Sequence, residues 1–87
     1  MTLYTEPMSV DVTYDPEARA YYVYLARRPV AQTLQVNDCV LVDVDADGSA
    51  VGLEVLRLDR LDLDACASKY GFADRAGAVG LALGAAA

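Results

Sequence analysis

The chain has 87 residues, of which 55% are hydrophobic and 23% charged, and its formal net charge is −6. This length predicts one globular domain, and this hydrophobic content excludes a disordered chain. The negative charge argues against nucleic acid and anionic membranes as partners, because both repel an acidic surface.

Several further classes are disfavoured by what the sequence lacks. The N-terminal stretch MTLYTEPMSV has no basic region followed by an apolar core, so no signal peptide is expected. No apolar run approaches the roughly 20 residues that a membrane helix needs. The two cysteines, Cys39 and Cys66, have no metal-ligand spacing, which favours reduced thiols in a cytoplasmic protein. We therefore expect a cytoplasmic protein without a cofactor.

A first hairpin is predicted between residues 10 and 25. Apolar and polar residues alternate over 10–14, and 21–25 is rich in β-branched and aromatic residues. Between them, Asp15-Pro16 favours a turn in which the Asp15 carboxylate accepts a backbone hydrogen bond. The register that puts the apolar side chains on one face pairs Tyr14 with Tyr21, Val12 with Val23 and Val10 with Leu25.

The next segments predict three more strands. They are separated by a polar turn at 27–29, the Asn37-Asp38 step and a loop that contains Asp47-Gly48. The expected strands cover residues 33–36, 39–44 and 50–56.

After residue 60 the sequence becomes rich in Ala and Leu at helical spacing. Asp62 is a suitable N-cap for a helix from Leu63 to Tyr70, and Gly71 suits the left-handed position that follows such a helix. Asp74 is a candidate cap for a second helix towards Ala87, although its glycines weaken it. The predicted fold class is α+β in a single domain, residues 1–87. An antiparallel β-meander of about five strands (residues 8–58) carries one or two C-terminal helices (residues 62–86) on one face.

The segment DVDADGSAVGLE, residues 43–54, has the spacing of an EF-hand calcium loop. Calcium takes six to eight oxygen ligands, which such a loop supplies between two helices. Here the flanking residues are typical of strands, and the ninth loop position is Val51. A hairpin with a two-residue type I′ turn at Asp47-Gly48 explains more of the pattern. It pairs the apolar residues as Val44–Val51, Val42–Leu53 and Val40–Val55.

The same register puts three carboxylates on the opposite face of the sheet. Asp43, Asp45 and Glu54 are therefore weak candidates for loose binding of a divalent cation. The alternative is a solvated acidic face, which we favour.

Two blocks of the sequence resemble a known family. They are YDPEARAYYVYL, residues 14–25, and VDVDADG followed by VGLEVL, within residues 42–56. This order of blocks is similar to the YuzE-like family of small bacterial proteins, a domain of unknown function (number 2283). The resemblance covers about residues 10–58 and implies a bacterial protein and the hairpin interpretation. It implies no activity, because the family has none established.

Enzymatic activity is not expected. The chain has no histidine, the commonest general base near neutral pH, and Lys69 is its single lysine. The two cysteines have no imidazole partner, and no phosphate-binding loop or small-molecule pocket is evident. Catalytic residues are therefore not assigned.

Protein–protein interaction is the predicted function. Four apolar or aromatic side chains are expected on the acidic face of the sheet, where tyrosines resemble the centre of an interface. The partner could be a second copy, forming a homodimer, or a basic protein, as for an antitoxin by analogy of charge and size only. The alternative is that the tyrosines form only cross-strand contacts. The predicted partner-binding residues are Tyr22, Tyr24, Leu41 and Leu56.

Overall fold

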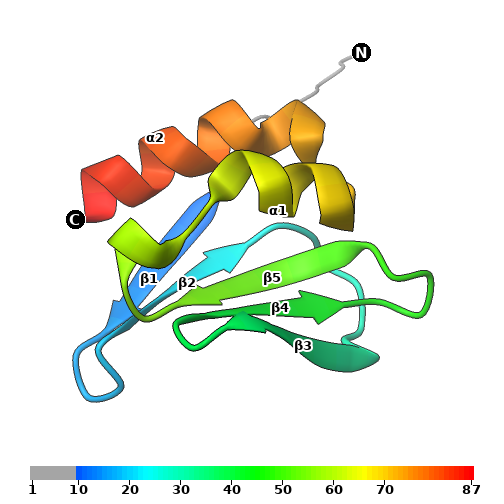
Figure 1. Ribbon diagram of the computed structural model, residues 1–87, viewed down its shortest axis with the longest axis horizontal. Helices are drawn as coiled ribbons and strands as arrows, with labels where there is room; N and C mark the ends of the chain where they lie inside the picture. The colour runs from blue at the N-terminus through cyan, green and yellow to red at the C-terminus, as the bar shows by residue number, and fades with distance from the viewer. Residues whose placement is uncertain (1–9) are drawn as a thin grey trace, which may run out of the picture.

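The computed structural model describes residues 10–87 and contains five strands followed by two α-helices (Figure 1). The strands are β1 (Asp11–Asp15), β2 (Ala20–Tyr24), β3 (Gln32–Asn37), β4 (Val40–Val44) and β5 (Ala50–Val55). The helices are α1 (Leu63–Tyr70) and α2 (Ala76–Ala86), preceded by the short 3₁₀ turns Leu58–Arg60 and Ala73–Arg75. The predicted α+β class is confirmed. The expected strand start at residue 8 and the absence of a signal peptide concern residues outside those described.

The strand order is not that of a simple meander. All pairs are antiparallel, but the order across the sheet is β1-β2-β5-β4-β3, so β5 lies between β2 and β4. The connection from β2 to β3 therefore crosses to the far edge of the sheet. Strands β2 to β5 form a Greek key: β3, β4 and β5 are connected as hairpins, and β2, joined to β3 by the long connection, lies beside β5. Local sequence patterns predict hairpins, and they do not reveal this long-range pairing.

The first hairpin forms as predicted. Val12 lies opposite Val23, and Tyr14 lies opposite Tyr21. One carboxylate oxygen of Asp15 accepts hydrogen bonds from the backbone N–H groups of residues 17 and 18, at 2.9 and 3.3 Å. The predicted Asx-type turn is therefore present.

The hairpin of β4 and β5 is also confirmed, but the turn type was wrong. Gly48 has a φ of 85°, whereas Asp47 is not among the residues with positive φ, so the turn is not type I′. The Gly48 N–H donates to the Asp45 carbonyl at 3.0 Å, and the Asp45 N–H donates to the Ser49 carbonyl at 2.9 Å. This is a three-residue loop, a type I turn followed by a left-handed glycine.

The longer loop displaces one predicted pair. Val40–Val55 and Val42–Leu53 pair as expected, but Val44 lies opposite Ala50, because a bulge leaves Val51 without a partner on β4. The Val51 carbonyl instead accepts hydrogen bonds from the N–H groups of Leu25 and Ala26, at 3.0 and 3.2 Å. The bulge thus holds the start of the β2–β3 connection against β5.

Helix α1 has the predicted bounds and caps. The Asp62 carboxylate accepts a hydrogen bond from the Ala65 N–H, and Gly71 adopts the left-handed conformation with a φ of 81°. The predicted cap for the second helix was wrong. Helix α2 begins after Arg75 without a side-chain cap, because Asp74 is part of the preceding 3₁₀ turn.

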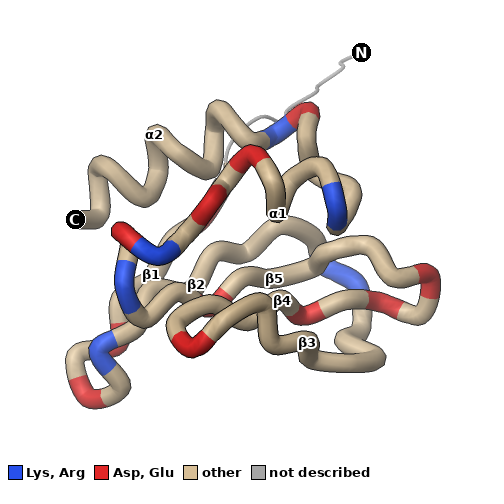
Figure 2. Tube along the Cα trace, viewed as in Figure 1, with Lys and Arg blue, Asp and Glu red and all other residues tan. Residues whose placement is uncertain are grey.

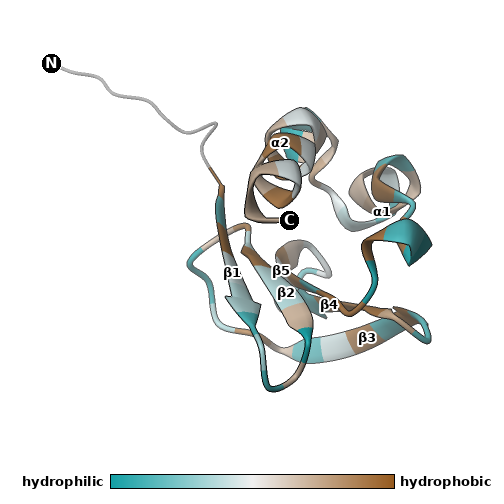
Figure 3. Ribbon diagram, turned by 90° about the vertical axis from the view of Figure 1, so that its left-hand side faces the viewer, coloured by the Kyte–Doolittle hydropathy of each residue, from teal (hydrophilic) through white to brown (hydrophobic). Residues whose placement is uncertain are grey.

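Both helices cover the same face of the sheet, and no other element of residues 10–87 covers the opposite face (Figure 3). The core lies between the sheet and the helices. Four of its residues on β4 and β5 are 0% exposed, namely Val40, Val42, Leu53 and Val55. Helix α1 contributes Cys66 and Ala67, and α2 contributes Val79 and Leu83. Among residues 10–87, no helix has the length and apolar character required to cross a membrane.

Removing a core side chain is expected to cost far more than removing the same side chain from the surface. Leu53→Ala should lower the free energy of unfolding by about 3 kcal/mol, because Leu53 is fully buried. Leu81 is 79% exposed, so Leu81→Ala should change it by less than about 0.5 kcal/mol. Urea unfolding measures both. Equal losses in the two variants would contradict the proposed core.

Candidate functional site

The candidate site is the sheet face that the helices leave uncovered, called here the outer face. Strand register assigns to it the side chains that alternate with the core residues. They form two rows across the five strands. The first row is Asp11, Tyr24, Gly52, Asp43 and Thr33, and the second is Thr13, Tyr22, Glu54, Leu41 and Gln35.

A polar network on this face joins side chains from three strands. The Tyr22 hydroxyl on β2 donates a hydrogen bond to one oxygen of Asp43 on β4, at 2.5 Å. The Thr33 hydroxyl on β3 donates to the other Asp43 oxygen, also at 2.5 Å. Both oxygens of this carboxylate are therefore engaged.

Gly52 allows the Tyr22 side chain to extend across β5 to Asp43. It lies on β5, between the two bonded residues, and a Cβ atom there would overlap the Tyr22 hydroxyl. Tyr22 therefore lies directly on the backbone of a strand that has no side chain at that point. Burial and the neighbouring Asp43 carboxylate raise the pKa of Tyr22, so its hydroxyl remains a neutral donor.

Tyr24 is the exposed member of the tyrosine pair. Its ring packs edge-on against that of Tyr22, with centroids 4.8 Å apart, yet the residue remains 51% exposed. Tyr22 is held by its hydrogen bond and half-buried, whereas Tyr24 offers a ring to solvent. The two predicted tyrosines are brought together, and only Tyr24 is freely accessible.

The two predicted leucines lie apart from the tyrosines. Glu54 stands between Tyr22 and Leu41 in the strand register, because it pairs with both. Leu56 follows β5 and is 40% exposed. The four predicted residues therefore share the outer face without forming one continuous apolar patch.

The three candidate cation ligands are not gathered into a site. Asp43 is bonded to two hydroxyls, while Asp45 accepts from Arg28 Nε at 2.6 Å. Over residues 10–87, no three Asp, Glu or Cys side chains lie close enough together to hold a metal ion. The acidic residues of the calcium-like motif thus support the hairpin and the sheet face.

Asp45 organises the loop that resembles an EF-hand. Its carboxylate accepts hydrogen bonds from the N–H groups of Asp47 and Ser49, at 2.9 and 3.0 Å. The bond from the Ser49 N–H and the side-chain bond from Arg28 lower the pKa of Asp45. The acidic β4–β5 loop is visible in Figure 2 at the end of the hairpin.

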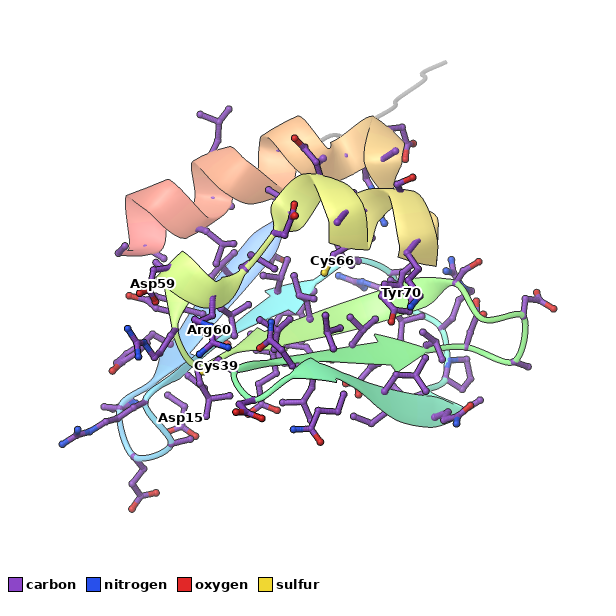
Figure 4. All side chains as sticks on the ribbon, in the orientation of Figure 1. Asp15, Cys39, Asp59, Arg60, Cys66 and Tyr70 are labelled. Carbon is purple, nitrogen blue, oxygen red and sulfur yellow. The ribbon has the colours of Figure 1, made fainter. Side chains whose placement is uncertain are left out.

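The thiols do not form a reactive pair. Cys39 and Cys66 are both free; Cys39 lies in the turn between β3 and β4, and Cys66 lies on α1 (Figure 4). Cys66 points from α1 towards the sheet, and burial raises the pKa of its thiol. A buried thiol with a raised pKa is a poor nucleophile.

Sequence reasoning missed two parts of the site. It placed Asp43 on this face but did not predict that two hydroxyl groups donate to it. It also did not identify Gly52 as the position where an aromatic ring packs against the strand backbone. A glycine inside a strand pattern was the available signal, because it often marks close approach by another group.

The architecture is that of a small α+β protein in which both described helices cover one face of the sheet. The family described as protein of unknown function (DUF2283) matches residues 11–58, more than half of the chain, and the chain belongs to that family. It is also 38% identical over 48 residues to the uncharacterized protein YuzE of Bacillus subtilis (strain 168). That alignment covers 49% of this chain and 37% of the relative's length. No solved structure matches the chain.

Adding one methyl group at Gly52 is expected to displace Tyr22. Gly52→Ala should lower the free energy of unfolding by about 2 kcal/mol, because the new Cβ overlaps the Tyr22 hydroxyl. In a Tyr22→Ala background the same substitution should be neutral or stabilising, since alanine normally favours a strand over glycine. Chemical unfolding of the four proteins measures this coupling. Equal effects of Gly52→Ala in both backgrounds would contradict it.

Removing the charge of Asp45 is expected to reduce stability in a pH-dependent way. Its pKa is lowered in the folded state, so its contribution is present above the ordinary Asp pKa, about 3.9, and is lost as the pH falls through the folded value. Asp45→Asn should therefore be less stable than the parent at pH 7, with the difference closing in acid. Thermal unfolding from pH 7 to pH 2 measures it. Asp47→Asn, in the same loop, is the control, and an unchanged difference down to pH 2 would refute the assignment.

Proposed function

We propose that the outer face is a protein-binding surface for a basic segment of a partner protein. The observation that supports this most directly is Tyr24, which is 51% exposed on an acidic sheet face. Rings of this kind bury much area on binding at low entropic cost and are enriched at interfaces.

Charge favours a basic partner. Asp11, Asp43 and Glu54 lie in the two rows of the outer face, and none of the ten residues in those rows is basic. Arg27, in the connection after β2, borders Tyr24 and Asp11 at one end. A two-fold dimer through this face would bring like charges together. A cationic partner meets complementary charge, and its cations can also stack on the Tyr24 ring.

The network beneath Tyr24 gives this surface a fixed shape. Tyr22 is held by Asp43, and the ring of Tyr24 packs against it at 4.8 Å. A side chain whose position is already limited loses less entropy on binding. Tyr24 is therefore the anchor of the proposed interface, and Tyr22 is its support.

The proposed role is non-enzymatic and cytoplasmic, with no nucleic acid, membrane or cofactor involved. The formal net charge of −6 and the absence of histidine support this view. Neutralisation of a basic protein, as antitoxins perform, is the nearest analogy, and it concerns charge and size only.

A cationic peptide tests the proposal. Hexa-arginine amide should shift the backbone NMR signals of Tyr24, Asp43 and Glu54 in a saturable way that weakens with added salt. Tyr24→Ser should weaken binding by roughly three- to tenfold, because the ring supplies a stacking surface for the cations.

Tyr14→Ser is the matched control. Tyr14 lies on the same hairpin and is 47% exposed, but it belongs to the opposite face. Its loss should leave peptide affinity unchanged. Equal weakening by both substitutions would reject the outer face as the binding surface. A homodimer in light scattering that Tyr24→Asp dissociates would instead assign the face to a second copy.

A further inference from the structure

We propose that the groove between the edge strand β3 and helix α1 binds an extended peptide segment of another protein, with one aromatic side chain in the groove, a cation beside Asp62 and a carboxylate beside Lys69. This groove lies beside the helical layer. Apart from Gln35, its residues are distinct from the two rows of the outer face. The inference therefore does not depend on the proposed function.

The groove has the size of one aromatic ring. It has a volume of about 160 Å³, and cavities of about 150 Å³ accommodate benzene. Its wall is largely apolar, formed by residues from the strand side and from α1. These residues are Val36, Val40, Ala65, Cys66 and Tyr70. Cys66 and Tyr70 lie on the inward side of α1, above the sheet (Figure 4).

The strand beside the groove is an edge strand. Among residues 10–87, β3 pairs only with β4, and its sequence QTLQVN contains no charged residue that would discourage another strand from pairing there. A register shift between Gln35 and Asn37 leaves Val36 without a partner on β4, and Val36 lines the groove. Peptides add to such edges through main-chain hydrogen bonds, and a neighbouring pocket supplies side-chain specificity.

The two ends of the groove carry opposite charges. Asp62 and Lys69 are seven residues apart along α1, which corresponds to about 10.5 Å of helix. One Asp62 oxygen accepts the capping bond from Ala65, and the other has no hydrogen bond among residues 10–87. Lys69 Nζ lies 5.6 Å from the centroid of the Tyr70 ring and makes no ion pair with the residues described. Both groups are thus available to a ligand.

These features determine the direction of the peptide. The Asn37 side chain donates to the Arg60 carbonyl at 3.0 Å, so the end of β3 lies near the start of α1, and the two elements run in opposite directions (Figure 1). A peptide antiparallel to β3 therefore runs from Asp62 towards Lys69. Alternate residues of a strand face the same way. The pattern that fits is a basic residue, an aromatic residue two positions later and an acidic residue after two more.

A second copy of this chain does not offer such a segment. Opposite charges occur four residues apart at two places, Asp15 with Arg19 and Arg60 with Asp64. In both, the middle position is acidic, Glu17 or Asp62. An acidic side chain is unsuited to an apolar cavity, because its desolvation is costly. The occupant is therefore a different protein.

The probe is the peptide acetyl-Thr-Arg-Thr-Phe-Thr-Glu-Thr-amide, followed by NMR titration of the full chain. Saturable shifts are expected at Val36, Ala65 and Lys69. Replacing the peptide phenylalanine with alanine should weaken binding at least tenfold, because the apolar contact is lost. Lys69→Glu should weaken it about three- to fivefold, and a peptide with lysine in place of glutamate should restore affinity to that variant.

Ala65→Leu is the decisive variant, because it fills the groove from an exposed position of α1 with a good helix former. It should abolish binding. Ser68→Leu, on the same helix but outside the groove, should leave binding unchanged, as should Tyr24→Ser on the outer face. Thermal unfolding confirms that each variant is folded.

Three results would overturn the proposal. The first is the absence of saturable shifts at millimolar peptide, or shifts that Ala65→Leu does not affect. The second is equal affinity for acetyl-phenylalanine amide, which would make the groove a small-molecule site. The third is a concentration-dependent dimer that Ala65→Leu dissociates, which would assign the groove to a second copy.

Discussion

The pairing of β5 with two neighbours makes one sheet out of two hairpins. β5 is hydrogen-bonded to β2 on one side and to β4 on the other, so among the described strands it alone links β1–β2 to β3–β4. The bulge at Val51 is part of this link, because its carbonyl accepts the N–H groups of both Leu25 and Ala26. An N–H group without a partner costs free energy when it is buried. The bulge in β5 thus provides a hydrogen-bond acceptor for the backbone N–H groups that follow β2.

The same central strand shapes the open face. A sheet covered on one side must protect its other side without a second layer of structure. Here the Tyr22 ring lies across Gly52 and is fixed by Asp43, which in turn accepts a bond from Thr33. An aromatic residue that covers a strand glycine compensates for the side chain that the glycine lacks. Tyr22 therefore belongs to the fold, and Tyr24 is the member of the pair whose ring remains exposed.

Local features of the fold were predictable, and long-range ones were not. Alternation fixes which face a side chain occupies, so the pairs Val12–Val23 and Val42–Leu53 followed from the pattern. Helix α1 followed from the cap at Asp62 and the glycine after its end. The insertion of β5 beside β2 has no local signal. In the β4–β5 loop, Gly48 has a positive φ and Asp47 does not, and a bulge follows. Both features depend on the hydrogen bonds between the loop and Asp45. Alternation also gives no lateral distances, which is why three carboxylates on one face did not amount to a cation site.

The two proposed surfaces differ in how they relate to the family. Every residue of the outer face lies within 11–58, the part of the chain that matches the family. The groove beside β3 needs α1, which begins at Leu63, beyond that match. A protein that shares only the sheet can therefore have the open acidic face without having the groove. It follows that the proposed recognition through Tyr24 is a property to seek across the family, whereas the proposed recognition through Asp62 and Lys69 depends on α1, which lies outside the family match.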